Sequence, residues 1–138
     1  MINALTVMKA RDVGEIRYST VLDYSGDLNH VLAKFGLTAD ANLLEEFDRK
    51  TAVSILTRLL WKDMAYSRPA MSEVEANDMA ESIVREYECP ASKYFSNCDW
   101  SNETHAGFSP LTESTFDGGL IISRSDHRCF CIWFQDED

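Results

Sequence analysis

The chain has 138 residues, a length typical of one domain that buries roughly two-thirds of the surface of its unfolded chain. Its 45% hydrophobic and 11% aromatic content favours a packed core over disorder, and no apolar run approaches the roughly 20 residues that span a bilayer. Twenty-three acidic against thirteen basic residues give a net charge of −10, which disfavours direct binding to nucleic acid or anionic lipid. The same charge suits a cationic partner, and it suits solubility alone equally well.

The N-terminus and the cysteine count both bear on the cellular compartment. The chain begins without the apolar segment of a secretory signal peptide, so we expect a cytoplasmic protein. In that compartment the four cysteines are expected to stay reduced. Residues 1–14 show little hydrophobic pattern, and we expect them to form a partly frayed terminus.

Hydrophobic periodicity predicts two elements early in the chain. Residues 15–24 alternate between apolar and polar side chains, as a half-buried strand does. Between positions 28 and 35, four apolar residues at spacing i, i+3, i+4 and i+7 share one face of a helix. The segment 25–27 supplies an N-cap and Gly36 a C-cap, so both ends of this short helix are predicted.

Two longer helical patterns follow. Residues 40–66 carry a broad apolar stripe with a candidate break at Asp48, and Pro69 excludes helical geometry beyond this region. Residues 72–88 predict a third helix, which begins at a capping box formed by Ser72 and Glu75. The outer face of this helix is acidic, as solvated helix faces often are. Its acids are Glu73, Asp78, Glu81, Glu86 and Glu88.

The last third of the chain combines a long connection with a hairpin. Residues 89–114 predict an irregular loop rich in aromatic and amide side chains, and loops of this length are often functional. Residues 115–138 predict a β-hairpin, whose first strand follows Gly118 and Gly119. The apolar run 129–134 is typical of a strand buried on both faces.

The order of these elements predicts one α+β domain over residues 1–138. We expect about three helices packed on one face of a small antiparallel sheet, because the helices are grouped before the C-terminal β-hairpin rather than alternating with strands. The last strand is expected to be central in the sheet.

No known catalytic signature occurs in the sequence, so we expect a protein that is not an enzyme and has no catalytic, cofactor-binding or metal-binding residues. Cys129 and Cys131, with His127 and Cys98, are the candidate zinc ligands. Two thiols on one face of an apolar strand more often behave as small hydrophobic side chains. A nucleophilic pair of Cys98 or Cys89 with His105 has no supporting spacing.

Two groups of acidic and aromatic residues outside the expected core are the predicted partner-binding residues. The first lies in the long loop and the second at the C-terminus, and charged residues around an aromatic anchor are typical of binding hot spots. They are Asp99, Trp100, Asn102 and Glu103 in the loop, and Asp136, Glu137 and Asp138 in the tail. The alternative role of Trp100 is to cover the core. The acidic helix is the second candidate surface.

Three segments resemble small bacterial immunity proteins, which are encoded beside the toxins of contact-dependent inhibition and other polymorphic toxin systems. The segments are LWKDMAY at 60–66, PLTESTFDGG at 110–119 and CIWFQDED at 131–138. The resemblance implies a cytoplasmic protein that binds and neutralises one cognate toxin domain, often a nuclease. A nuclease cleft is basic because it holds phosphates, so an acidic inhibitor could occlude it.

Two other functions remain open from the sequence. The chain could be a small enzyme of unknown substrate. A pocket that brings together Asp99, His105 and Asp117 would favour this alternative. It could also be an acidic scaffold or regulatory subunit whose charge serves solubility. The sequence does not indicate an oligomeric state.

Overall fold

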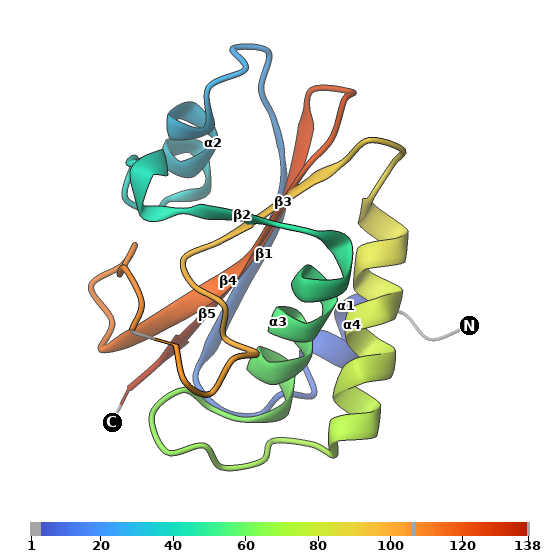
Figure 1. Cartoon of the computed structure of the whole chain (residues 1–138), viewed down its shortest axis with the longest axis vertical. Coiled ribbons are helices and arrows are strands. Elements are labelled where there is room, and N and C mark those ends of the chain that lie inside the picture. The colour runs from blue at the N-terminus through green and yellow to red at the C-terminus, as the bar shows by residue number, and fades with distance from the viewer. Residues whose placement is uncertain (1–3, 106, 138) are drawn as a thin grey trace.

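A five-stranded antiparallel sheet forms the centre of the computed structural model, which describes residues 4–105 and 107–137 (Figure 1). The strands are β1 (Glu15–Leu22), β2 (Glu45–Phe47), β3 (Lys93–Ser96), β4 (Phe116–Ser123) and β5 (Arg128–Asp136). Their spatial order is β1-β5-β4-β3-β2, so β5 has a strand on each side. The helical elements are α1 (Ala4–Met8), α2 (Leu28–Phe35), the 3-10 turn η1 (Ala41–Leu43), α3 (Arg49–Trp61) and α4 (Glu73–Tyr87).

The predicted C-terminal hairpin is confirmed. β4 and β5 pair from Phe116 opposite Asp136 to Ser123 opposite Cys129. All residues in the range 129–134 are buried, and β5 pairs with β1 along its other edge. The α+β class and the interior position of the last strand are therefore correct.

Gly118 and Gly119 lie within β4, not before it. A Cβ atom at Gly118 would collide with the indole of Trp100, and one at Gly119 would collide with the carbonyl oxygen of Ile132 and the ring of Trp133. Glycine is needed at both positions because two tryptophan rings lie directly on the strand backbone.

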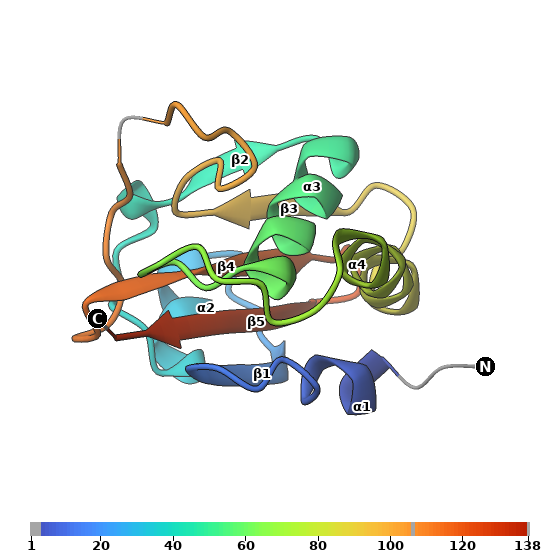
Figure 2. The ribbon, with the colours of Figure 1, turned by 90° about the horizontal axis from the view of Figure 1, so that it is seen from below.

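Helices cover both faces of the sheet (Figures 1 and 2). α3 and α4 pack on the face that carries Leu120 and Ile122 of β4 and the even-numbered apolar residues of β5. α2 packs on the opposite face, against Ile121 and Trp133. The expectation of helices on one face is wrong for α2, because an apolar run with alternating side chains needs cover on both faces.

The predicted ends of two helices are confirmed. α2 begins after Asp27, whose side chain accepts a hydrogen bond from the amide of Asn29, and it ends at Gly36 with φ of 88°. α4 begins after Ser72, whose hydroxyl accepts from the amide of Glu75 at 3.1 Å. Each cap satisfies an amide or carbonyl that the helix leaves unpaired.

The pattern over residues 40–66 is not one helix. α3 begins after Asp48, whose carboxylate accepts from the amide of Thr51, and it ends at Trp61. The residues before Asp48 form η1 and the short strand β2, which pairs with β3. Periodicity missed this strand because its pairing partner lies far along the chain.

Residues 4–14 are not a frayed terminus. Ala4 and Met8 of α1 are buried, and α1 packs against α4 (Figure 2). Arg11 follows with only 3% of its surface exposed. The N-terminal segment is therefore part of the core.

Arg11 and Asp136 form a buried ion pair with two hydrogen bonds. Nη1 of Arg11 donates to Oδ1 of Asp136 at 3.0 Å and Nη2 donates to Oδ2 at 2.9 Å. Nε of Arg11 donates to the carbonyl of Leu59 at 2.6 Å, and the amide of Met64 donates to Asp136 at 2.9 Å. The guanidinium also lies 4.9 Å from the ring centroid of Phe134. This ion pair joins the N-terminal segment, the end of α3 and the end of β5.

Replacing Trp133 with alanine should lower the free energy of unfolding by about 3–5 kcal/mol, because the fully buried ring leaves a cavity. The indole also donates to Asp117 at 3.1 Å, and that donor would be lost. Urea denaturation followed by circular dichroism measures the change. The control is Tyr24→Ala, since Tyr24 is 71% exposed and should change stability by no more than about 0.5 kcal/mol. A wild-type midpoint for Trp133→Ala would show that this ring is not part of the core.

Candidate functional site

The predicted binding loop divides into surface and core residues. Asn102 and Glu103 are exposed, and Asp99 is half-buried with its carboxylate accepting from the amide of Ser101 at 3.1 Å. Trp100 is only 7% exposed. The expected surface position of Trp100 is therefore corrected: its ring lies on the strand backbone, and only a small part of it is exposed.

Trp100 and Asp117 attach the long loop to the sheet. Nε1 of Trp100 donates to Asn97 at 3.0 Å, and Asn97 donates in turn to the carbonyl of Asp117 at 2.8 Å. The buried carboxylate of Asp117 accepts from the amides of Leu111 and Thr112 and from the indole of Trp133. These hydrogen bonds, rather than an opposite charge, satisfy the buried carboxylate.

The predicted acidic tail is not a cluster of free carboxylates. Asp136 is 2% exposed and paired with Arg11, so its assignment to the partner-binding surface is corrected. Glu137 is exposed and accepts from the hydroxyl of Thr115 at 2.6 Å, a bond that lowers the pKa of its carboxyl. Asp138 lies outside the described residues. The tail thus contributes one exposed carboxylate among the residues that the structure describes.

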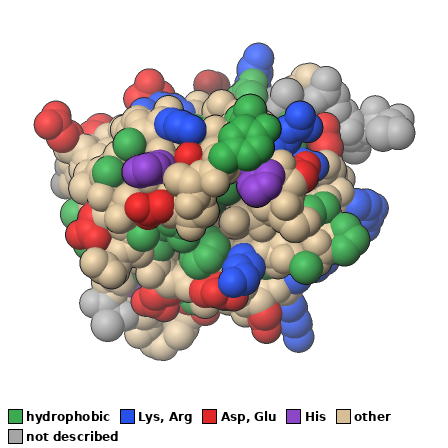
Figure 3. Space-filling model, turned by 90° about the horizontal axis from the view of Figure 1, so that it is seen from above, with side chains coloured by type: hydrophobic (Ala, Val, Ile, Leu, Met, Phe, Trp, Pro, Cys, Tyr) green, Lys and Arg blue, Asp and Glu red, His purple; other side chains and the backbone are tan. Residues whose placement is uncertain are grey.

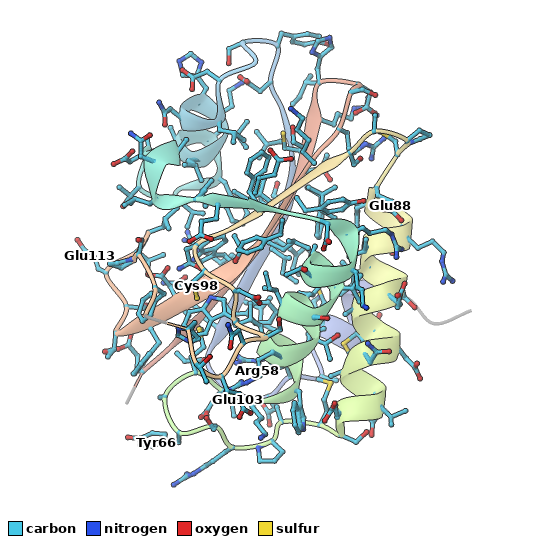
Figure 4. All side chains as sticks on the ribbon, in the orientation of Figure 1. Arg58, Tyr66, Glu88, Cys98, Glu103 and Glu113 are labelled. Carbon is cyan, nitrogen blue, oxygen red and sulfur yellow. The ribbon has the colours of Figure 1, made fainter. Side chains whose placement is uncertain are left out.

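Two adjoining hollows open between α3, the α3–α4 connection and the long loop, in the part of the chain that the structure describes. The first, here called the acidic hollow, has a volume of about 270 Å³ and is lined by Ser54, Thr57, Arg58, Trp61, Glu73, Asn77, Ser101 and Glu103. The second, the aromatic hollow, has a volume of about 550 Å³ and is lined by Arg58, Lys62, Met64, Ser67, Trp100, Glu103, His105, Gly107, Phe108 and Phe116. Arg58 and Glu103 line both hollows, and Figure 4 shows them side by side at the end of α3.

The acidic hollow brings together the two acidic surfaces that the sequence predicted separately. Glu103 comes from the loop and Glu73 from the first turn of α4. Within the described residues neither carboxylate has a hydrogen bond or an ion pair, whereas Glu81 and Glu88 of α4 both bind Arg49. Unpaired negative charge therefore flanks this hollow.

The aromatic hollow has an apolar wall and a basic floor. The ring centroids of Trp100 and Phe108 lie 5.1 Å apart, and those of Phe108 and Phe116 lie 6.0 Å apart. Lys62 lies over the ring of Trp61 with its ammonium 4.0 Å from the centroid.

Arg58 is half-buried between the two hollows. Its guanidinium donates to the carbonyl of Lys62 at 3.0 Å and to the hydroxyl of Ser67 at 3.2 Å. Burial lowers the pKa of this guanidinium, and the negative charges of Glu103 and Asp63 oppose that shift only in part.

The basic residues of this site were not among the predicted binding residues. The sequence did offer a signal for Arg58: Ser54, Arg58 and Trp61 are spaced at i, i+4 and i+7, which places all three on one face of α3. This side of α3 borders a hollow only because the long loop lies beside it. The path of the loop depends on hydrogen bonds between residues that are distant in the sequence.

The residues of the enzyme alternative do not gather in either hollow. Asp117 is fully buried and Asp99 accepts from Ser101, and neither lines the hollow that contains His105. Nδ1 of His105 accepts from the amide of Gly107 at 3.0 Å. Among the described residues no three histidine, cysteine or acidic side chains come together as metal ligands. The absence of an enzymatic activity or a metal remains a prediction.

The opposite end of the sheet has a mixed surface. Figure 3 shows hydrophobic and histidine side chains there among charges of both signs. The ring of Tyr24 lies 4.8 Å from that of His127, and a hollow of about 100 Å³ opens beside Asp23 and Leu28.

Comparison with protein-family models, with curated proteins and with solved structures found no match. Among the described residues, no helix has the length and apolar character needed to cross a bilayer.

The four thiols differ in their environment. Burial raises the pKa of Cys98 to about 12 and also raises the pKa values of Cys129 and Cys131. Cys89 is partly exposed, and hydrogen bonds with Ser92 and Ser125 lower the pKa of its thiol.

Cys89 should therefore react first with iodoacetamide in the native protein, because a lowered pKa populates the reactive thiolate at lower pH. Its rate should rise through a pH below the ordinary thiol range, and Ser92→Ala should move that rise to higher pH. Mass spectrometry after brief alkylation measures each site. The urea-unfolded protein is the control, in which all four cysteines should react alike. Equally fast labelling of native Cys98 would contradict its buried position.

Proposed function

We propose that this chain is a cytoplasmic immunity protein that binds and neutralises a cognate basic toxin domain, a nuclease. The observation that carries the proposal is the pair of unpaired carboxylates, Glu73 and Glu103, at the acidic hollow. They come from separate parts of the chain, and both belong to surfaces on which the sequence concentrates acids. The resemblance of three segments to immunity proteins agrees with this role.

The charge distribution supports binding to a cationic surface. The net charge is −10, and much of the acid on α4 lies at its N-terminal end, where Glu73, Glu75 and Asp78 are exposed. Acids in the first turn of a helix also stabilise that helix through a favourable interaction with its dipole, so part of this charge contributes to the stability of the fold. Glu103 has no such role, since it lies in an exposed loop.

This charge distribution supports the proposed occlusion of a basic cleft. A nuclease cleft holds phosphates with cations, and an acidic surface can occupy the same cations. Opposite net charges also accelerate the encounter, an effect that weakens as salt shortens the Debye length. The proposed contact surface is the rim of the acidic hollow together with Asp99 and Asn102 of the loop.

The test begins with the protein encoded by the neighbouring upstream gene, co-expressed with this chain and recovered by pull-down. Binding kinetics are then measured by surface plasmon resonance at two salt concentrations. The double variant Glu73→Gln/Glu103→Gln should lower the association rate constant about threefold or more at low salt, because both charges lie on the contact surface. The difference should shrink at high salt.

The matched control is Glu86→Gln/Glu113→Gln, which removes the same charge from exposed positions away from the hollows. Circular dichroism verifies that both variants fold. Equal loss in the two double variants would show that only net charge matters. Failure of the wild type to bind the neighbouring gene product would remove the support for an immunity role.

A further inference from the structure

Among the described residues, Arg58 and Arg17 are half-buried arginines without an ion pair. Arg17 lies over the ring of Phe35, whereas Arg58 lines both hollows. Three other partly or fully buried arginines have an anionic partner. Arg11 pairs with Asp136, Arg49 with Glu88, and Arg124 with Asp126. Arg58 forms no ion pair with any residue that the structure describes, and it donates only to a carbonyl and a hydroxyl. A half-buried guanidinium without a carboxylate partner has lost hydration and gained little in return.

The surroundings of Arg58 could supply the rest of an anion site. Lys62 and Ser67 line the aromatic hollow beside it, and His105 lies on the loop that closes the other side. The hollow measures about 550 Å³, which falls within the range of small-molecule sites. Its wall of Trp100, Phe108 and Phe116 favours an apolar body over a highly charged one.

We propose that the aromatic hollow binds a small organic carboxylate with an aromatic or aliphatic body. The carboxylate would pair with the guanidinium of Arg58, whose planar fork matches its two oxygens, and with the ammonium of Lys62. The body would pack against Phe108 and Phe116. A phosphate fits less well, because its second negative charge would lie near Glu103. This inference does not depend on the proposed toxin partner.

Neutralising Glu103 distinguishes the binding of an anion in this hollow from the binding of a basic protein. Its carboxylate lines the same hollow and acts on Arg58 through its charge. Removing that charge should strengthen the binding of an anion, whereas it should weaken the binding of a basic protein. The two proposals therefore predict opposite effects for Glu103→Gln and can fail separately.

The experiment uses phenylacetate as the probe, titrated into the purified 138-residue protein and followed by calorimetry and by the indole signals in NMR spectra. We expect a Kd on the order of 1 mM, as suits a ligand of this size. Benzylamine and benzyl alcohol share the ring but lack the negative charge, and both should bind at least about tenfold more weakly. The indole of Trp100 should shift with phenylacetate, since its ring lines the hollow.

The Arg58→Gln variant should weaken phenylacetate binding at least about tenfold, and Glu103→Gln should strengthen it. The matched control is Arg85→Gln, which removes the same charge from a side chain that is 76% exposed and lines neither hollow. Circular dichroism verifies folding, and the Glu103→Gln result decides the question if Arg58→Gln does not fold. The proposal is overturned if phenylacetate binds no better than benzyl alcohol, or if Glu103→Gln leaves its affinity unchanged.

Discussion

The fold depends on the buried ion pair between Arg11 and Asp136. Two charges that are buried away from water need hydrogen-bond and ion-pair partners to offset their lost hydration, and both Arg11 and Asp136 have such partners. Arg11 meets the carboxylate and the carbonyl of Leu59, and Asp136 meets the guanidinium and the amide of Met64. Such a pair contributes little over an apolar replacement, but removing one member leaves an unpaired charge in the core. It therefore fixes how three distant segments meet.

The candidate site lies directly on this arrangement. The residues that follow the end of α3, Lys62 and Met64, form the floor of the aromatic hollow, and the backbone of Met64 is held by Asp136. The opposite wall is held by a second buried polar network, from Asp117 through Asn97 to Trp100. Both networks use buried hydrogen bonds to position an exposed loop and a helix end. The surface chemistry is thus set by polar groups inside the core.

The sequence predicted the local features and missed those that depend on distant partners. The caps Asp27 and Ser72 and the hairpin were readable because their signals lie within a few residues. The same local reading placed Asp136 at the surface, since an acid after an apolar strand is normally solvated. Nothing near Asp136 reveals that Arg11, more than a hundred residues earlier, would bury it. Trp100 was misplaced for the same reason, because the glycine beneath its ring lies in another strand.

The most direct test of this account is a double-mutant cycle with Arg11→Met, Asp136→Asn and the double variant, measured by urea denaturation. Each single change should lower the free energy of unfolding by about 3–5 kcal/mol, since it leaves the other polar group buried without its partner. The double variant should lose much less than the sum of the two, because no charge is then left unpaired. Additive losses, or single losses below about 1 kcal/mol, would contradict the central role of this ion pair.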